Sequence, residues 1–325
     1  MFLKRYIPLK NKVKSATPKK KYGYCKYAIV SAIYNVEKYL DDYFKSIINQ
    51  RLDFKNNIHI ILVDDGSIDN SANIIKKYQK KYPKNITYIY KENGGQASAR
   101  NLGLKLLQED PNLKDKFTWV TFTDPDDFLD RDYFYEVDEF LAKNRDDSIS
   151  MIACNLIFYF EKHEAYKDTH PLKFKFQENI TILPNSNLNK NIQLSAATAF
   201  VNLNTIKNTK QIKPIFNEEI SNFEDGYFLN LLLIQNLNKK SAFLKNAKYY
   251  YRKRGDGSST LDNIEAAYKK QLIKNGYLLL LLQNEELLQS IPVFTQQTIL
   301  YDLIWFIKDN INKDNFSFYS NEEKE

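Results

Sequence analysis

The amino-acid sequence predicts an α/β protein in which helices cover both faces of a mostly parallel central sheet. Apolar runs of strand length alternate with amphipathic runs of helix length from residue 27 to residue 160. The chain has 325 residues, 43% of them hydrophobic, which is enough for a large folded core. Ligands of such sheets bind beyond the carboxyl ends of the strands, and two of these ends carry clustered aspartates.

The expected elements follow from these runs in chain order. Strands are expected at 27–34, 58–63, 86–90, 117–122 and 148–160, and helices at 36–50, 67–82, 94–108 and 132–143. Ser67 or Asp69 is suited to cap the second helix, and Pro83 follows its end. From residue 161 the pattern loosens into a hairpin or irregular strands. A helix at 224–237, a strand at 242–254 and two helical segments divided near Pro292 are expected after it.

Charge divides the chain unevenly. Of the 47 Lys and Arg residues, nine lie within residues 1–26, where no Asp or Glu occurs, so the remainder carries 38 against 40 acidic residues. We expect residues 1–26 to form a basic arm, either a solvated tail or a segment in contact with an anionic membrane face. No nucleic-acid-binding signature is present. Two cysteines without metal-like spacing and no apolar leader indicate a cytoplasmic protein, with peripheral membrane contact through the arm.

The segment WVTFTDPDDFLD, residues 119–130, ends a buried strand in three carboxylates. Asp124 and Asp126 flank a rigid proline, and oxygen ligands on a short loop suit Mg²⁺ or Mn²⁺. The alternative is that Asp126 or Asp127 caps a helix that begins near Leu129; we assign Asp127 to such capping.

Two further segments carry polar groups at strand ends. VDDGSIDNS, residues 63–71, places Asp64 and Asp65 where a carboxylate can accept hydrogen bonds from a ribose or a base, or else belong to a simple turn. ENGGQASARNLGL, residues 92–104, offers Gly94 and Gly95 for close backbone approach and Arg100 for a diphosphate.

Together these segments resemble the family 2 glycosyltransferases, inverting enzymes of the GT-A fold. The match covers about residues 27–135 and continues more weakly through FEDGYF, residues 223–228, and YYYRKRGDGSST, residues 249–260. The resemblance implies a nucleotide-sugar donor, usually a UDP-sugar, a divalent metal and a saccharide acceptor. With the Lys-, Asn- and Ile-rich composition it suggests bacterial surface polysaccharide synthesis, such as capsule formation.

The resemblance also implies roles for individual residues. Ser31 and Tyr34 would border the base, Glu37 would follow on the same loop, and Asp65, with Asp64, would contact uracil or ribose. Gly95 and Arg100 would lie near the donor phosphates, and so would Arg252 and Arg254 on a closing loop. Asp126 would bind the metal directly, and Asp124 would contact the ribose or the metal's water. Many family members place a histidine near that loop, whereas this chain has none after His170.

The catalytic base implied by the resemblance is Asp225 of the Glu224-Asp225 pair, which would deprotonate the acceptor hydroxyl. The alternative for this pair is a helix start that favours acids through the helix dipole. Two other functions compete: a catalytically silent nucleotide-sugar-binding scaffold in a larger polymerase, and a sugar nucleotidyltransferase. The expected organisation is the arm 1–26, a GT-A domain 27–261 and a helical extension 262–325. Within the GT-A domain, residues 27–130 would bind the nucleotide and residues 131–261 the acceptor.

Overall fold

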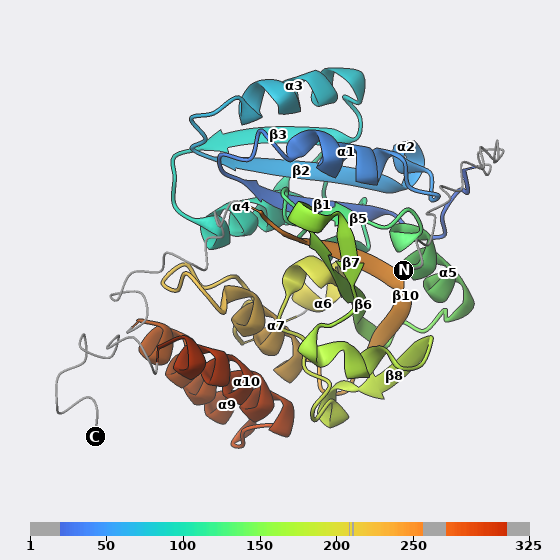
Figure 1. Ribbon diagram of the computed structural model, residues 1–325. Helices are drawn as coiled ribbons and strands as arrows, with labels where there is room; N and C mark the ends of the chain where they lie inside the picture. The colour runs from blue at the N-terminus through green and yellow to red at the C-terminus, as the bar shows by residue number, and fades with distance from the viewer. Residues whose placement is uncertain (1–19, 208, 210, 256–270, 311–325) are drawn as a thin grey trace, which may run out of the picture.

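The structure, a computed structural model, describes residues 20–207, 209, 211–255 and 271–310 (Figure 1). The strands are β1 (Tyr27–Ile33), β2 (Ile58–Asp65), β3 (Ile86–Lys91), β4 (Trp119–Thr121), β5 (Phe128–Leu129), β6 (Ile149–Phe160), β7 (Ala165–Lys167), β8 (Ile180–Pro184), β9 (Ala199–Asn202) and β10 (Lys240–Lys253). The α-helices are α1 (Leu40–Ile48), α2 (Phe54–Asn57), α3 (Ser71–Lys81), α4 (Gln96–Glu109), α5 (Tyr133–Lys143), α6 (Leu203–Lys207), α7 (Glu224–Ile234), α9 (Leu279–Leu288) and α10 (Val293–Asn310). The short 3-10 turns are η1 (Glu161–His163), η2 (Pro171–Phe176), η3 (Asn185–Asn187) and η4 (Ala196–Thr198), and a π-helical segment, η6 (Leu272–Leu278), leads into α9.

One sheet runs through the molecule in the order β3-β2-β1-β4-β9-β6-β10-β5, with β7 added beside β6 and β8 beside β10. The strands β3, β2, β1 and β4 are parallel, as the alternation of strands and helices predicted. β9 is antiparallel to both of its neighbours, and β10 is parallel to β6. The sheet is therefore parallel in its first half and mixed in its second, where β5, β7 and β8 also pair antiparallel.

Both faces of the sheet are covered, which explains why the central strands are continuously apolar. All eight residues of β2 are buried. On one face, α4 and α7 pack against the sheet, and α9 and α10 lie outside α7 (Figure 1). On the other face, α1, α3 and α5 complete a second core with Tyr27, Ile29 and Ile60.

The helix predictions hold with shorter bounds. α1 begins at Leu40 rather than at residue 36, and α3 begins at Ser71, so neither Ser67 nor Asp69 is its N-cap. Asp69 still serves the start of α3, because its carboxylate accepts a hydrogen bond from the Ser71 N–H. The irregular segment after residue 161 contains β7, η2 and β8, and η6, α9 and α10 form the predicted C-terminal helical part. Residues 262–270 and 311–325 of that part lie outside the described residues.

The end of the predicted basic arm is held against the body. Asp138, which is buried on α5, accepts hydrogen bonds from the Tyr24 N–H, the Cys25 N–H and the Tyr27 hydroxyl at 2.8–2.9 Å. Lys21 forms an ion pair with Glu139. Residues 1–19 of the arm, for which membrane contact was predicted, lie outside the described residues. Among the described helices, none combines the length and apolar character that crossing a bilayer requires.

Candidate active site

The carboxyl ends of β1, β2 and β4 are joined by a network of side-chain hydrogen bonds. Ser31, predicted to border a base, is fully buried, and its hydroxyl contacts the Tyr43 hydroxyl at 2.6 Å and the Thr123 carbonyl at 2.7 Å. It thus ties β1 to α1 and to the segment after β4, and its hydroxyl does not face open space. Tyr34, on the loop after β1, is 53% exposed.

The loop after β1 is attached to the loop after β2. The Glu37 carboxylate accepts a hydrogen bond from the Asn70 N–H at 2.8 Å, and the Glu37 N–H donates to Asp69 at 2.9 Å. Asp64 is buried and accepts from the Ser67 N–H at 2.9 Å and from the Tyr88 hydroxyl at 2.7 Å. Through these hydrogen bonds, the carboxylates of Glu37 and Asp64 fix the loops at the carboxyl ends of β1 and β2.

Asp65 and the glycine segment before α4, which were predicted separately, lie in direct contact. The Asp65 carboxylate accepts from the Gly94 N–H at 3.0 Å and the Gly95 N–H at 2.8 Å, and it pairs with Lys91 at 2.6 Å. Gly95 has φ +88°, a left-handed conformation that glycine adopts without strain. In this arrangement the two glycine N–H groups point at Asp65 and join the end of β2 to the start of α4.

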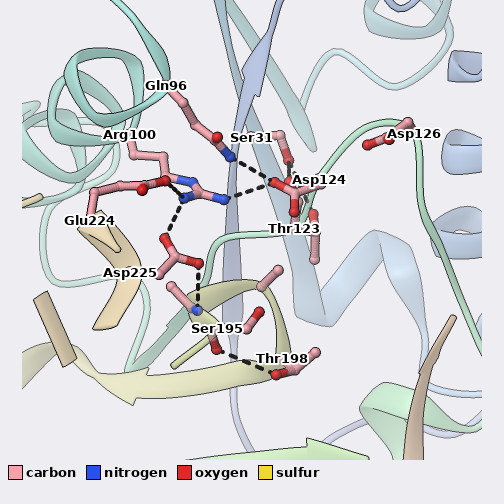
Figure 2. A network of polar contacts seen from close by, with 12 residues as sticks. Ser31, Gln96, Arg100, Thr123, Asp124, Asp126, Ser195, Thr198, Glu224 and Asp225 are labelled. Carbon is pink, nitrogen blue, oxygen red and sulfur yellow. Dashed lines mark hydrogen bonds and ion pairs between the residues drawn. The ribbon is translucent and has the colours of Figure 1, made fainter. Parts of the chain in front are cut away.

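Arg100 lies within a cluster of carboxylates. Its Nη1 is 2.5 Å from Asp225 Oδ1 and 3.4 Å from Glu224 Oε1, and its Nη2 is 2.8 Å from Asp124 Oδ1 (Figure 2). The Arg100 side chain is 1% exposed. We expected Arg100 beside the donor phosphates; the structure places its guanidinium between the aspartate after β4 and the acidic pair of α7. Gln96 also donates to Asp124 Oδ1, at 3.0 Å.

Asp225 is oriented from two sides. One carboxylate oxygen contacts Arg100, and the other accepts a hydrogen bond from the Ala196 N–H at 2.8 Å (Figure 2). Phe223, the residue directly before α7, has φ +68°, a conformation that bulky residues rarely adopt and that concentrates at functional sites. A carboxylate has about four lone-pair sites, so Asp225 keeps acceptor capacity for an incoming hydroxyl.

The cluster around Arg100 contains more negative than positive groups. A single guanidinium faces three carboxylates, those of Asp124, Glu224 and Asp225. Burial raises the pKa of Asp225, and Arg100 and the Ala196 N–H lower it in part. Burial and the adjacent Asp225 raise the pKa of Glu224 to about 8. A general base works best when its pKa lies near the working pH, so a raised pKa suits proton abstraction by Asp225.

The turn that holds Asp225 is itself held by a buried lysine. Lys175 of η2 donates to the Ile192 carbonyl at 2.7 Å and to Gln193 Oε1 at 2.6 Å. Gln193 Nε2 donates to the Ser195 carbonyl and to the Thr198 hydroxyl, both at 2.8 Å. Burial lowers the pKa of Lys175 to about 7. This chain of contacts fixes η4, whose first N–H reaches Asp225.

The remaining aspartates of the 119–130 segment have different partners. Asp126 Oδ2 pairs with Arg254 Nη2 at 2.7 Å. Asp127 is buried and accepts from the Arg252 N–H at 2.7 Å. The prediction that Asp127 caps a helix near Leu129 is wrong, because β5 occupies 128–129 and α5 begins at Tyr133. The chain is extended at 128–129 because it pairs with β10, so no helix begins there for Asp127 to cap.

Arg252 and Arg254, predicted on a closing loop over the diphosphate, lie at the end of β10. Arg252 is 8% exposed, and its Nε donates to the Asp126 carbonyl at 2.8 Å. Its Nη atoms pair with Glu161 at 3.2 Å and Asp42 at 3.3 Å. The Arg252 guanidinium is thus committed to protein partners, whereas Arg254 stays on the carboxylate of Asp126. Residues 256–260 of the predicted loop lie outside the described residues.

The donor set of Asp124 and Asp126 fits a hard divalent cation. Asp126 pairs with the guanidinium of Arg254, which shows that its carboxylate attracts positive charge. Among the described residues, no group of three His, Cys, Asp or Glu side chains is placed to hold a metal ion. Mg²⁺ and Mn²⁺ suit such a sparse site, because Mg²⁺ in particular usually keeps several waters and binds one or two carboxylates plus substrate phosphates.

Comparison with known proteins agrees with this arrangement. The family model described as glycosyl transferase family 2 matches residues 28–199, a span that includes Asp65, Arg100, Asp124 and Asp126. The chain belongs to glycosyl transferase family 2. Asp225 and Arg254 lie beyond the matched span, so their assignment rests on the contacts described above.

Relatives and solved structures place this family 2 chain among proteins of known fold. The minor teichoic acid biosynthesis protein GgaB of Bacillus subtilis (strain 168) is 35% identical over 289 residues, which are 87% of this chain and 29% of GgaB. The chain therefore spans less than a third of that relative's length.

The structure of S. aureus TarS 1–349 in complex with UDP-GlcNAc matches with a TM-score of 0.68 at 20% identity, covering 92% of this chain and 77% of that chain. The mannosyltransferase PcManGT from Pyrobaculum calidifontis, in complex with GDP-Man and Mn²⁺, matches with a TM-score of 0.52 at 14% identity, covering 93% of this chain and 84% of that chain. These likenesses confirm the predicted GT-A fold.

Several residues of this family 2 site could not be found from the sequence. Ala196 contributes only its backbone N–H to Asp225, and Lys175 acts through Gln193 and η4. Tyr249 of β10 accepts a hydrogen bond from the Asp124 N–H at 3.1 Å. No motif marks these residues, because their roles depend on strands and turns that meet only in the folded chain. Gln96, which donates to Asp124, was also missed. It is the one residue of this set that the sequence could have indicated, because it is a polar side chain one helical turn before Arg100 on α4.

Proposed function

We propose that this chain is the glycosyl-transferring domain of an enzyme that moves a sugar from a UDP-sugar to a hydroxyl of a bacterial cell-surface polymer, with inversion of the anomeric configuration. The observation that carries the proposal is the position of Arg100, which joins Asp124 on the expected donor side to Asp225 at the start of α7. A donor-binding loop and a candidate base are thereby held next to one another.

Asp225 would remove the proton from the acceptor hydroxyl as that oxygen attacks the sugar carbon. The nucleoside diphosphate leaves from the opposite side, so a single displacement inverts the configuration and no nucleophilic side chain is needed. The Ala196 N–H and Arg100 orient the Asp225 carboxylate, and its side chain stays 18% exposed, which leaves room for an acceptor hydroxyl to approach.

Asp126 and Asp124 would hold Mn²⁺ or Mg²⁺ at the donor phosphates. Such an ion supplies Lewis-acid neutralisation of the charge that develops on the leaving diphosphate. Support comes from the donor set of the two aspartates and from PcManGT, whose structure contains GDP-Man and Mn²⁺. The UDP donor is supported by TarS, whose structure contains UDP-GlcNAc.

The polymer acceptor is supported by GgaB, a minor teichoic acid biosynthesis protein, and by TarS, a poly(ribitol-phosphate) β-N-acetylglucosaminyltransferase. The acceptor could therefore offer a saccharide hydroxyl or a hydroxyl of a polyol phosphate chain. A cytoplasmic position with peripheral membrane contact through the basic arm 1–26 also belongs to this proposal, and it is supported by the nine Lys and Arg residues of that arm.

Donor turnover tests the proposal. Purified protein is incubated with UDP-GlcNAc, and with other UDP-sugars, in the presence of Mn²⁺ or of a chelator, and UDP release is measured. Slow, metal-dependent release that accelerates when a polymer acceptor is added is the expected result. Binding without release of UDP would instead favour the silent scaffold. Pyrophosphate release from UTP and a sugar phosphate would favour the nucleotidyltransferase.

A further inference from the structure

A cavity of about 290 Å³ lies beside the loop that carries Asp126. It is lined by Asp42 and Lys45 of α1, Phe128 of β5, Tyr159 of β6, Tyr166 of β7 and Arg252 of β10. Apart from Arg252, none of these residues was predicted to have a function. The volume is close to the lower end of ligand sites, which span roughly 300–1,000 Å³, so the cavity suits a small ring rather than an extended chain.

Aromatic rings form a fixed wall of this cavity. Tyr166 packs against Tyr159 with ring centroids 5.0 Å apart and against Tyr250 at 4.8 Å, and Phe128 packs edge-on against Tyr159 at 5.1 Å. Tyr250 is anchored in turn, because its hydroxyl donates to Asp130 at 2.6 Å. Tyr166 nevertheless remains 55% exposed. A rigid aromatic surface that stays open to solvent offers contact area with little loss of side-chain entropy on binding.

The polar groups of the cavity balance one another in charge. The Arg252 guanidinium pairs with Asp42 and Glu161, at 3.3 and 3.2 Å, and lies 5.2 Å from the ring centroid of Phe128. Lys45 adds one further cation on the exposed side of α1. An anionic ligand would meet the carboxylates of Asp42 and Glu161, whereas a neutral ligand rich in hydroxyls finds both donors and acceptors.

We propose that this cavity binds one sugar ring of the acceptor, with an apolar face of the ring against Tyr166 and its hydroxyls at Asp42 and Lys45. The C–H groups on the face of a pyranose are weakly positive and are attracted to the negative face of an aromatic ring. An acyclic polyol phosphate lacks such a face and carries a charge that the cavity does not complement. The proposal therefore names a cyclic sugar, and it rests on the function proposed above.

The cavity shares a wall with the transfer site. The Arg252 Nε donates to the Asp126 carbonyl at 2.8 Å, and the Arg252 N–H donates to Asp127 at 2.7 Å. Phe128 follows these aspartates directly in the chain. A sugar ring bound in the cavity would therefore lie next to the loop that presents Asp126, on the side of that loop lined by α1 and β7, and a longer acceptor would pass from one site to the other.

The test measures binding of methyl β-N-acetylglucosaminide and methyl α-glucoside by saturation-transfer NMR, with ribitol 5-phosphate as the acyclic probe. Wild-type protein should bind at least one glycoside. Tyr166→Ala should weaken that binding about fivefold, the loss of one aromatic contact. Lys45→Ala, which leaves the aromatic rings untouched, should also weaken it. Tyr22→Ala, which removes a tyrosine that is 73% exposed elsewhere, is the matched control and should bind normally.

Failure of this inference is separable from failure of the proposed function. Release of UDP from UDP-GlcNAc should be the same in Tyr166→Ala as in the wild type, because Tyr166 has no role in the donor site proposed above. Transfer to a saccharide acceptor should show a raised KM with kcat retained. The proposal is overturned if no glycoside binds, if Tyr166→Ala binds as well as Tyr22→Ala, or if ribitol 5-phosphate competes with the glycoside for the cavity.

Discussion

The Arg100 guanidinium lies between Asp225, at 2.5 Å, and Asp124, at 2.8 Å, although these two aspartates are separated by about a hundred residues of sequence. Glu224 completes the cluster at 3.4 Å. Asp124, on the proposed donor side, and Asp225, the proposed base, therefore share one buried cation, so a substitution at one should alter the environment of the other.

Replacing Arg100 by methionine should destabilise the fold strongly. Removing one partner of a buried ion pair leaves an uncompensated charge and typically costs about 3–5 kcal/mol. Here three carboxylates would lose their common partner. We expect a lowered free energy of unfolding in urea, partly restored on acidification, because protonation removes the repulsion between the carboxylates. Arg100→Lys keeps the positive charge but cannot contact carboxylates on two sides. Its free energy of unfolding should lie between those of Arg100→Met and the wild type. Equal stability of Arg100→Met and wild type would contradict the cluster.

Asp225→Asn should separate donor binding from transfer. Loss of a general base typically lowers the rate of the chemical step by about 10²- to 10⁴-fold. The Kd for UDP, measured by calorimetry, should change little, since the proposed base acts on the acceptor hydroxyl and not on the nucleotide. Glu224→Gln is the matched control on the same helix turn. A larger loss of kcat with Glu224→Gln than with Asp225→Asn would assign the base to Glu224.

Asp126→Ala should abolish the stabilisation that Mn²⁺ gives in the presence of UDP. A ligand that binds only the folded state raises the Tm, and loss of a metal-binding carboxylate removes that increment. The readout is the difference in Tm with and without Mn²⁺ at fixed UDP. Asp132→Ala, two residues after that segment and 41% exposed, should keep the full difference. If Asp126→Ala keeps it as well, Asp126 is not a metal ligand.

Gly103→Ala should destabilise α4 against β1. A Cβ at position 103 would collide with Val30 Cγ1 of the neighbouring strand. Overpacking of a well-filled core typically costs about 1–3 kcal/mol. A double-mutant cycle with Val30→Ala checks the cause, because shortening Val30 should relieve part of the penalty. Strictly additive effects in urea denaturation would argue against this contact.

Lys175 should make the stability of the protein rise with pH. Burial lowers the pKa of Lys175 to about 7 in the fold, whereas the unfolded lysine titrates near its ordinary value of 10.5. Between these values the unfolded state binds more protons, so the free energy of unfolding increases from pH of about 7 upward. In Lys175→Met this rise should be reduced. The measurement is urea denaturation across that pH range, and an unchanged slope in the variant would show that Lys175 stays charged.

Much of the first half of the fold follows from local pattern. β2 is buried at every position, and its apolar run ends at Asp64 and Asp65, so both the strand and its carboxyl end are visible in the sequence. α1 and α3 begin a few residues later than predicted, because the segments before them are held by contacts such as Glu37 with Asp69 and Asn70. Such loop-to-loop contacts leave no periodic signal.

The second half depended on long-range pairing. Asp127 was assigned to capping a helix near Leu129, but Phe128 and Leu129 form β5 and pair with β10, a strand more than a hundred positions away. The same strand carries Arg252 into an aromatic cavity, where its guanidinium pairs with Asp42 and Glu161. Neither result is encoded in the local composition of 119–130 or 249–254.

The sequence by itself determined the family, the parallel first half of the sheet and the acidic residues at the strand ends, because these depend on short apolar runs and on motif order. Only the tertiary structure decided the partners of those residues: Asp225 with Arg100 and the Ala196 N–H, Asp65 with the Gly94 and Gly95 N–H groups, and Asp126 with Arg254. The physical reason is that burial makes each charge depend on whatever donors the fold brings within hydrogen-bond distance, and most of these donors come from distant segments of the chain.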